Sequence, residues 1–258
     1  MENKIIRNLL FDFDFISSKD NNIIINNIIN EHNSYIEKNP FLITPNVDQI
    51  VKFNEQKMKS IKDFYKNSEY ILPDGQPIVW SSRFLGKSLI SRLTGSDFFV
   101  EFWNEVKKTN TTVFMVVPNN FVADYLEKEY INCKCYVPTM FSIHENSYKI
   151  VKKEIKKMII NFSPKYFFVG LGFPKQEILA KDIYEEMTTK NIQFPLTLLL
   201  GASFEFYVGE VKRAPIWMQK NGLEWFYRFM QEPRRMFKRY FIDDTKFLLI
   251  VIREYLKK

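Results

Sequence analysis

The chain has 258 residues, 46% of them hydrophobic and 16% aromatic, so it can form one large domain with a substantial core. The apolar run "FLLIVI" near its C-terminal end is far shorter than the roughly 20 residues that a membrane-spanning helix needs, and we expect no signal peptide. Cys133 and Cys135 form the single cysteine cluster and His32 and His144 are the two histidines, so a zinc site is not expected. A reduced, cytoplasmic protein is expected.

The net charge of +7 is concentrated at one end of the chain. Residues 212–258 contain 12 Lys and Arg against 5 Asp and Glu, so they account for the whole excess. The composition therefore predicts a neutral core, residues 1–209, followed by a basic appendage, residues 210–258.

Apolar strands and amphipathic helices alternate along the core. Strands are expected at 40–46, 69–75, 112–117, 134–138, 165–170 and 194–202, and helices at 21–32, 47–67, 95–109, 119–130, 147–162 and 174–190. The strands are nearly continuous apolar runs, as in sheets buried on both faces. The pattern predicts an α/β fold with a mostly parallel sheet and helices on both faces. Alternation would place Cys133 and Cys135 on one face of a strand, where neighbouring cysteines pair poorly.

The appendage is rich in both aromatic residues and arginines. We expect two or three short helices in it, separated at Pro215, Gly222 and Pro233. Aromatic side chains interleaved with cations suit the interface of a membrane with anionic lipids. Trp217 and Trp225 are expected instead to pack the appendage onto the core.

Three of the predicted strands end in residues that can carry chemistry: Thr44–Asn46, Pro73–Gly75 and 170–177. Ligands of open α/β sheets bind beyond the carboxyl ends of the strands, so we expect the three segments to surround one crevice. In "GLGFPKQE" the glycines allow close approach of a ligand, and the start of a helix favours an anion. The stretch lacks the third glycine of the dinucleotide fingerprint, which counts against a nicotinamide or flavin oxidoreductase.

Six motifs occur in the order and spacing of one enzyme family. They are "TPN", "LPDG", "SRLTGSD", "VGLGFPKQE", "GASFEFYVGEVKRAPIWMQ" and "GLEWFYRFMQEPRRMFKRY". From about residue 41 to 240 the chain resembles the WecG/TagA/CpsF glycosyltransferases, glycosyltransferase family 26. The resemblance implies a Rossmann-like core with a C-terminal helical appendage, and an inverting, metal-independent hexosyltransferase without a cofactor.

The resemblance also implies the substrates. Such enzymes move a sugar from a UDP-sugar to a polyprenyl-diphosphate-linked sugar at the cytoplasmic face of the membrane, in teichoic acid, capsule or exopolysaccharide biosynthesis. The transferred sugar is expected to be N-acetylmannosamine or another hexose. Family members self-associate through the core, so a homo-oligomer is among the expected partners, together with the anionic membrane surface.

The family's functional positions can be transferred onto this sequence. The proposed general base falls on Asp74, and the other active-site positions fall on Thr44, Asn46, Arg92 and Gln176. The appendage positions fall on Arg228, Arg235, and Lys238 or Arg239.

The residues themselves add substrate-binding candidates near the strand ends: Gly75, Gly170, Gly172, Pro174, Lys175 and Glu177. Lys175 and Glu177 have an alternative role, which is to pair with neighbours and fix the loop. No metal ligand set is apparent, so arginines and a helix N-terminus are expected to neutralise the leaving group.

Two further readings remain open. The first is a glucosyltransferase of the same family in exopolysaccharide assembly, which would share these motifs. The donor sugar is open because "PDGQPIVW" and Glu205 depart from the family pattern in loops that shape the donor pocket. A nucleic-acid-binding protein would explain the basic tail, but it would leave Asp74 and the glycine loop unexplained, so no nucleic acid is expected among the partners.

Overall fold

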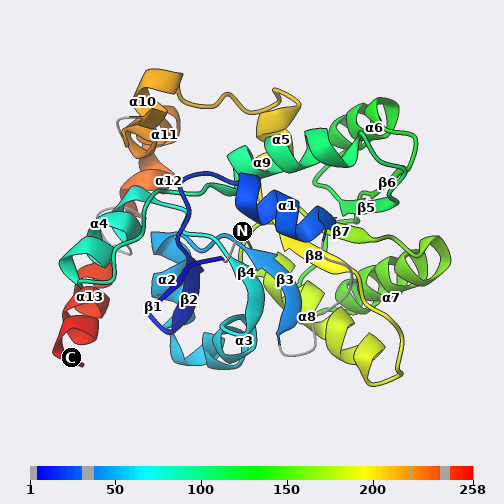
Figure 1. Cartoon of the computed structure of the whole chain (residues 1–258). Coiled ribbons are helices and arrows are strands. Elements are labelled where there is room, and N and C mark those ends of the chain that lie inside the picture. The colour runs from blue at the N-terminus through cyan, green and yellow to red at the C-terminus, as the bar shows by residue number, and fades with distance from the viewer. Residues whose placement is uncertain (1–4, 31–37, 221, 239–244, 258) are drawn as a thin grey trace.

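The computed structural model describes residues 5–30, 38–220, 222–238 and 245–257, apart from the side chains of Lys220, Arg235 and Lys238. Its centre is a six-stranded sheet in the order β4-β3-β8-β7-β5-β6, in which every neighbouring pair is parallel (Figure 1). The strands are β3 (Asn39–Ile43), β4 (Ser68–Ile71), β5 (Val113–Val116), β6 (Cys133–Tyr136), β7 (Tyr166–Val169) and β8 (Leu196–Leu199). The predicted parallel α/β fold is confirmed.

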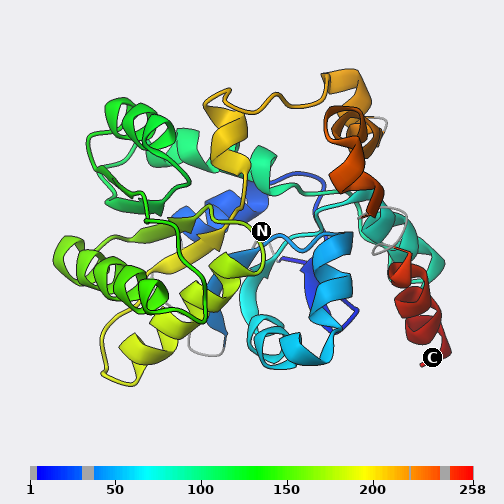
Figure 2. The same cartoon turned by 180° about the vertical axis from the view of Figure 1, so that it is seen from behind.

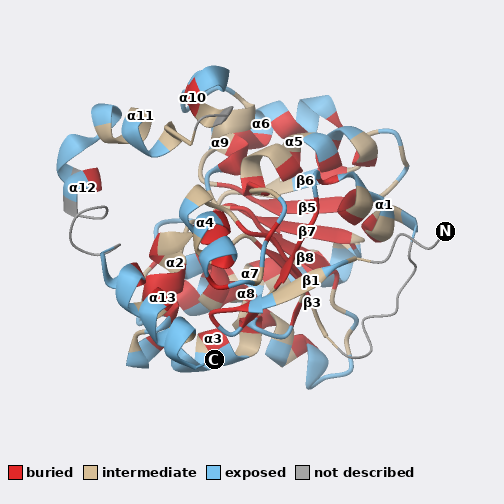
Figure 3. Ribbon diagram, turned by 60° about the vertical axis from the view of Figure 1, so that its left-hand side comes forward, coloured by how far each residue is buried: buried red, intermediate tan, exposed pale blue. Residues whose placement is uncertain are grey.

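Helices lie on both faces of the sheet (Figures 1 and 2). Those of the core are α1 (Asn22–Asn30), α2 (Val47–Phe53), η1 (Gln56–Met58), α3 (Lys59–Tyr65), α4 (Gln76–Phe84), α5 (Gly95–Val106), α6 (Asn120–Glu129), α7 (Asn146–Phe162), α8 (Lys175–Thr188) and α9 (Ser203–Tyr207). Successive strand side chains point to opposite faces, so each face has its own apolar cluster. Phe41 and Phe167 pack toward α2, α3, α7 and α8, whereas Leu42 and Phe168 pack toward α1, α5, α6 and α9. The strands between these helices are mostly buried (Figure 3).

A small hairpin precedes this sheet. β1 (Arg7–Leu10) pairs antiparallel with β2 (Phe13–Ile16) through a turn at Phe11 and Asp12, both of which have positive φ. Phe13 and Phe15 are buried in the same cluster as Phe41, so the hairpin extends the core beside β4.

The segment predicted as one helix at 47–67 is divided. Asn54 ends α2, and its side-chain amide donates a 2.8 Å hydrogen bond to the Ile50 carbonyl. The chain then passes through η1 before α3 begins. The apolar residues keep helical spacing across this break, so their pattern alone predicts one helix. Two helices, α4 and α9, were not predicted.

The cysteines lie as expected on β6. Cys133 is buried, Cys135 is half-buried, and both are free thiols with 3.9 Å between their sulfur atoms. The Cys135 backbone N–H donates to the Glu127 carboxylate of α6. Both residues are therefore structural members of the strand.

The C-terminal region contains four helices among its described residues: α10 (Ile216–Lys220), α11 (Glu224–Gln231), α12 (Pro233–Lys238) and α13 (Lys246–Leu256). The last of them packs onto the core beside α2, where the rings of Phe247 and Phe11 are 5.2 Å apart (Figure 1). In the part of the chain that the structure describes, no helix is both long and apolar enough to cross a membrane.

The expectation for the two tryptophans was wrong. Trp217 is 60% exposed and Trp225 is 46% exposed, so neither is a core anchor of the appendage. The C-terminal residues that pack into the core are instead Phe247 and Val251 of α13, and Ala214, Met218 and Met236 are also buried.

Candidate active site

The carboxyl ends of the sheet strands are level with one another. Ile43 of β3 pairs with Ile71 of β4 and with Leu199 of β8, and Val169 of β7 pairs with Leu199 and with Val116 of β5. The three segments that carry the candidate residues therefore all leave the sheet at the same edge. The Asp74 N–H donates to the Pro45 carbonyl over 3.2 Å, which ties the first two segments together.

A cavity of about 480 Å³ lies where β3 and β4 end. Five of the residues expected at the site line it: Asn46, Asp74, Gly75, Arg92 and Arg228. Its other lining residues come from α2, α4, α5, α11, α13 and the residues next to these helices, so the core and the C-terminal helices build this cavity together. We call it the Asp74 cavity.

The Asp74 carboxylate is the titratable group of this cavity best suited to acid–base chemistry. Burial raises its pKa to about 6, and the negative charge of Glu224 adds to the shift. The cations Arg92 and Arg228 and a hydrogen bond from the Gly95 N–H act in the opposite direction. A carboxylate with a pKa near neutrality accepts protons efficiently at the pH of a cell.

Thr44 and Asn46 lie beside this carboxylate on the loop that follows β3. The Asn46 side chain accepts from the Gln49 N–H, and the Gln49 side chain accepts from the Asn46 N–H, forming a capping box at the start of α2. Asn46 is therefore held rigidly in the cavity wall. Thr44 packs against Gly95, where a Cβ atom would come within 3.0 Å of the threonine hydroxyl.

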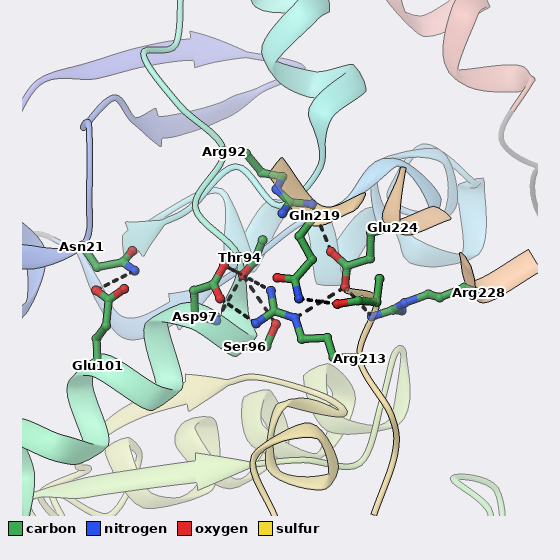
Figure 4. A network of polar contacts seen from close by, with 11 residues as sticks. Asn21, Arg92, Thr94, Ser96, Asp97, Glu101, Arg213, Gln219, Glu224 and Arg228 are labelled. Carbon is green, nitrogen blue, oxygen red and sulfur yellow. Dashed lines mark hydrogen bonds and ion pairs between the residues drawn. The ribbon is translucent and has the colours of Figure 1, made fainter. Parts of the chain in front are cut away.

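Three arginines converge on one carboxylate at the edge of the cavity. Glu224 lies 3.1 Å from Arg92, 3.6 Å from Arg213 and 3.7 Å from Arg228 (Figure 4). Its side chain is only 13% exposed. The cluster holds cations from the core and from the C-terminal helices in one place, and Arg92, Glu224 and Arg228 line the same cavity as Asp74.

Arg213 carries the network into the core. It donates to Asp97 over 2.6 Å (Figure 4). Burial alone would raise the pKa of Asp97, but hydrogen bonds from Arg213 and Thr94 outweigh it and hold that pKa below the usual value. The Arg228 guanidinium also lies 5.0 Å from the ring centre of Phe206 on α9. Helix α11 is thus fixed to the core by charged contacts.

A second cavity, of about 350 Å³, lies where β5, β6, β7 and β8 end. Gly170, Gly172 and Lys175 line it, opposite Pro118 and Glu205. From β5 the chain continues to β6 on one side, and from β7 it continues to β8 on the other, so this is a topological switch point of the sheet. We call it the Gly170 cavity.

The sequence predicted that the glycine loop and Asp74 surround one crevice. This prediction is wrong, because the two lie in different cavities. Gly95 stands between Thr44, which adjoins the Asp74 cavity, and Ser203, which follows Ala202 of the Gly170 cavity; a Cβ on this glycine would lie 3.0 and 3.4 Å from their hydroxyl oxygens. The two cavities are neighbours on one edge of the sheet, separated at this point by the N-terminus of α5.

Gln176 and Glu177 are both buried beneath the glycine loop. The Gln176 amide donates to the Glu177 carboxylate over 2.9 Å, and its carbonyl accepts from the Gly201 N–H over 3.1 Å. Burial raises the pKa of Glu177 to about 7. Both ends of the Gln176 amide are thus used within the protein, where they connect the glycine loop to the loop after β8.

The remaining candidates occupy the start of α8 and the C-terminal helices. Pro174 is the N-cap of α8 and follows a cis peptide bond, and Lys175 donates to the Phe141 carbonyl over 3.0 Å. Arg235 and Lys238 belong to α12, but their side chains lie outside the described part of the structure, and Arg239 lies outside the described residues altogether. Among the residues that are described, no three His, Cys, Asp or Glu side chains are grouped as a metal site.

Comparison with known families agrees with this architecture. The model of the glycosyl transferase WecG/TagA/CpsF family matches residues 13–258, nearly the whole chain. The chain belongs to this family.

The chain is similar to curated members of the WecG/TagA/CpsF family. It is 30% identical to the N-acetylglucosaminyldiphosphoundecaprenol N-acetyl-beta-D-mannosaminyltransferase of Bacillus subtilis strain 168 over 85% of this chain and 82% of the relative. It is 29% identical to the enzyme of the same name from Staphylococcus aureus strain MW2, over 77% of this chain and 74% of the relative.

Sequence reasoning missed two residues of this glycosyltransferase site, Arg213 and Glu224. Both stand inside motifs that marked the family, "KRAPIWMQ" and "GLEWFYR", but neither was given a role. A signal was present, because Glu224 is one of few acids in a strongly basic segment. Its partners are distant in sequence, so only the fold shows what it binds.

Proposed function

We propose that this glycosyltransferase moves N-acetylmannosamine or a closely related hexose from a UDP-sugar to the sugar of a polyprenyl-diphosphate-linked acceptor, with inversion. The observation that carries the proposal is the Asp74 carboxylate, which has a pKa of about 6 and shares its cavity with Arg92 and Arg228. The substrates named for the Bacillus and Staphylococcus relatives support the choice of acceptor and sugar.

In the proposed reaction an acceptor hydroxyl attacks the anomeric carbon of the donor from the face opposite the diphosphate. The hydroxyl oxygen forms the new bond to carbon, and its proton passes to an oxygen of Asp74. The bond between the anomeric carbon and the β-phosphate oxygen breaks, and its electron pair leaves with UDP. Attack from the opposite face inverts the configuration at that carbon.

We assign the nucleotide diphosphate of the donor to the Gly170 cavity. The cavity lies at a switch point of the sheet, and the N-terminal turn of α8 opens beside it, with Gly172 and Lys175 in its wall. The positive end of the α8 helix dipole and the Lys175 ammonium would neutralise negative charge on the leaving group without a metal ion. The donor sugar would then extend past Gly95 toward Asp74.

Gln176 acts, in this proposal, through the loop it supports. Its buried amide joins Gly201 to Glu177, so it keeps the loops of the donor cavity in register. Gly172, where a Cβ atom would meet open space, leaves room for the diphosphate, and Gly75 allows the turn with a φ of 143° directly after the base. Gly170 makes room for the ring of Phe204 in the floor of the same cavity.

The appendage would bind the acceptor's diphosphate. Arg92 from the core and Arg228 from α11 both line the Asp74 cavity, and we propose that Arg235 and Lys238 or Arg239 bind the same diphosphate. Such a site would operate on the inner face of the membrane, with the basic helices near anionic lipid headgroups. Association of copies through the core is also part of the proposal.

A panel assay tests this function. The protein is incubated with different UDP-sugars and an N-acetylglucosamine diphosphate carrying a short lipid chain, with a chelator present, and released UDP is measured. We expect UDP release with a UDP-N-acetylhexosamine that depends on the lipid-linked acceptor and persists with the chelator. Release that requires added metal, or that is equal without an acceptor, would contradict the proposal.

A further inference from the structure

Part of the exposed surface of helix α13 is apolar. Leu248, Ile252 and Leu256 follow one another at a spacing of four residues, which places them on one side of the helix, and they are 64%, 52% and 76% exposed. We call these three residues the α13 stripe. The adjacent side of the same helix, with Phe247 and Val251, is buried in the core. A surface helix normally presents polar residues to solvent, as α13 does at Lys246 and Arg253, but the α13 stripe exposes apolar side chains instead.

The α13 stripe starts inside the Asp74 cavity. Leu248, its first residue, lines that cavity together with Phe247 and Trp225. Eight residues of helix separate Leu248 from Leu256, so the stripe extends roughly 12 Å outward from the cavity. A ligand with a polar head in the cavity can therefore continue onto the stripe without crossing a polar surface.

Helix α4 adds a second apolar side to this path. It begins at the same cavity with Gln76 and Pro77, and its exposed Trp80 and Phe84 are one turn apart. The Phe84 ring lies 5.4 Å from the ring of Tyr255 near the end of α13. Figure 3 shows exposed segments on both helices, which lie on the same side of the molecule in Figures 1 and 2.

A positively charged cavity that is followed by an apolar stripe indicates the chemistry of the ligand. The cavity contains the guanidinium groups of Arg92 and Arg228, which match a diphosphate, and the α13 stripe continues from the same cavity. A lipid bilayer would also cover the stripe, but it would not explain why the stripe begins in the wall of a charged cavity. A diphosphate ester of a long hydrocarbon chain explains both features.

We propose that the α13 stripe, with Trp80 and Phe84 opposite, binds the first isoprene units of the acceptor's lipid chain. This inference rests on the proposed function and adds a subsite to it. The chain would be held by the protein itself, before it enters the membrane. The subsite would thereby orient the diphosphate and the sugar toward Asp74.

Two acceptors with the same N-acetylglucosamine diphosphate head test the subsite: a methyl ester and a geranyl ester. Both are used as monomers, without detergent or vesicles, so that no membrane can contribute. We expect kcat/KM to be at least tenfold higher for the geranyl ester, since its hydrocarbon chain would be removed from water on the α13 stripe. We expect Ile252→Ser to bring the geranyl-to-methyl ratio of kcat/KM at least fivefold closer to one.

Ile150→Ser is the matched control. Ile150 is 61% exposed on α7, so the same substitution is made on another helix surface, and the ratio should stay at its wild-type value. Equal kcat/KM for the two esters, with a preference that appears only after vesicles are added, would overturn the subsite and assign the stripe to the membrane.

Dissociation constants for the two esters, measured by calorimetry, separate this inference from the function on which it rests. Absence of transfer to both esters would contradict the proposed function. The subsite would then be decided by binding alone: tighter binding of the geranyl ester, lost in Ile252→Ser, supports it, and equal binding overturns it.

Discussion

Arg92 and Glu224 form an ion pair in which the guanidinium Nη1 and the carboxylate Oε2 are 3.1 Å apart. Arg92 precedes α5 in the core and Glu224 begins α11, 132 residues later in the chain. Their side chains are only 17% and 13% exposed. Loss of one partner from a largely buried pair leaves the other charge unpaired. This contact therefore links docking of the C-terminal helices to the charges that line the Asp74 cavity.

Replacing Glu224→Gln should shift the pH dependence of the enzyme. In the wild type, kcat/KM should fall about tenfold for each pH unit below about 6, because Asp74 then becomes protonated and cannot accept a proton. The negative charge of Glu224 raises the pKa of Asp74, so its removal should move this acid limb to lower pH. The measurement is kcat/KM between pH 4.5 and 8.

Glu105→Gln serves as the control for that shift. Glu105 pairs with Lys108 on the exposed side of α5, so its loss removes a charge without touching the cavity. An acid limb that stays in place in Glu224→Gln, or moves to higher pH, would show that Glu224 does not act on Asp74.

Some residues of the site could be predicted from sequence and others could not, because they reach the cavity in different ways. Asp74 and Asn46 could be predicted together because parallel strands end at one edge, and the register of Ile43 with Ile71 places them there. Glu224 could not be predicted, since its three arginine partners meet only in the folded chain. The division into two cavities also escaped prediction, because it depends on where Gly95 packs.

Glu177→Gln should change how stability depends on pH. The folded state raises the pKa of Glu177 to about 7 from 4.5, so between these values the folded protein binds a proton that the unfolded chain has lost. The free energy of unfolding should therefore fall as pH rises through this interval, by roughly 3 kcal/mol at most from this group. Glutamine should remove that contribution.

Urea unfolding of both proteins at pH 4.5 and pH 8 measures this effect. The other titrating groups are common to the two proteins, so the difference between their pH dependences reports on Glu177. The variant should gain stability relative to the wild type at pH 8. A wild type that loses no more stability with rising pH than the variant would contradict the assigned pKa.

Gly170→Ala should destabilise the fold through steric overlap. A Cβ atom at residue 170 would overlap the buried ring of Phe204 and lie 2.9 Å from the Gly201 carbonyl oxygen. Overpacking of this kind typically costs about 1–3 kcal/mol, which urea unfolding would detect. Phe204→Leu should partly relieve the overlap, so the double variant should be more stable than the sum of the two single changes allows. Strict additivity would argue against this packing.

Lys175→Met tests the assignment of the Gly170 cavity to the donor. Removing the positive charge should raise KM for the UDP-sugar about tenfold, equivalent to about 1.4 kcal/mol, and leave KM for the lipid-linked acceptor within twofold. Lys149→Met, on the exposed side of α7, is the matched control. A rise in the acceptor KM alone would place the acceptor, not the donor, in this cavity.

The fold was more predictable than the site because buried helices and strands space their apolar residues regularly along the sequence. Strands buried on both faces read as continuous apolar runs, and helices such as α7 repeat apolar residues toward one face. Helix α4 escaped prediction because Pro77 follows the turn at Gly75 and because Trp80 and Phe84 face outward. The same two exposed residues, Trp80 and Phe84, are the ones that we propose bind the lipid chain of the acceptor.

The central claim is that Asp74 takes the proton of the acceptor hydroxyl, and Asp74→Asn tests it most directly. Asparagine keeps the shape of the side chain and an oxygen for the Gly95 N–H, but it cannot accept the proton. Transfer should fall about 10²- to 10⁴-fold at pH 7.5, while the dissociation constant for the UDP-sugar stays within about threefold. Transfer at the wild-type rate by a correctly folded Asp74→Asn protein would contradict the account.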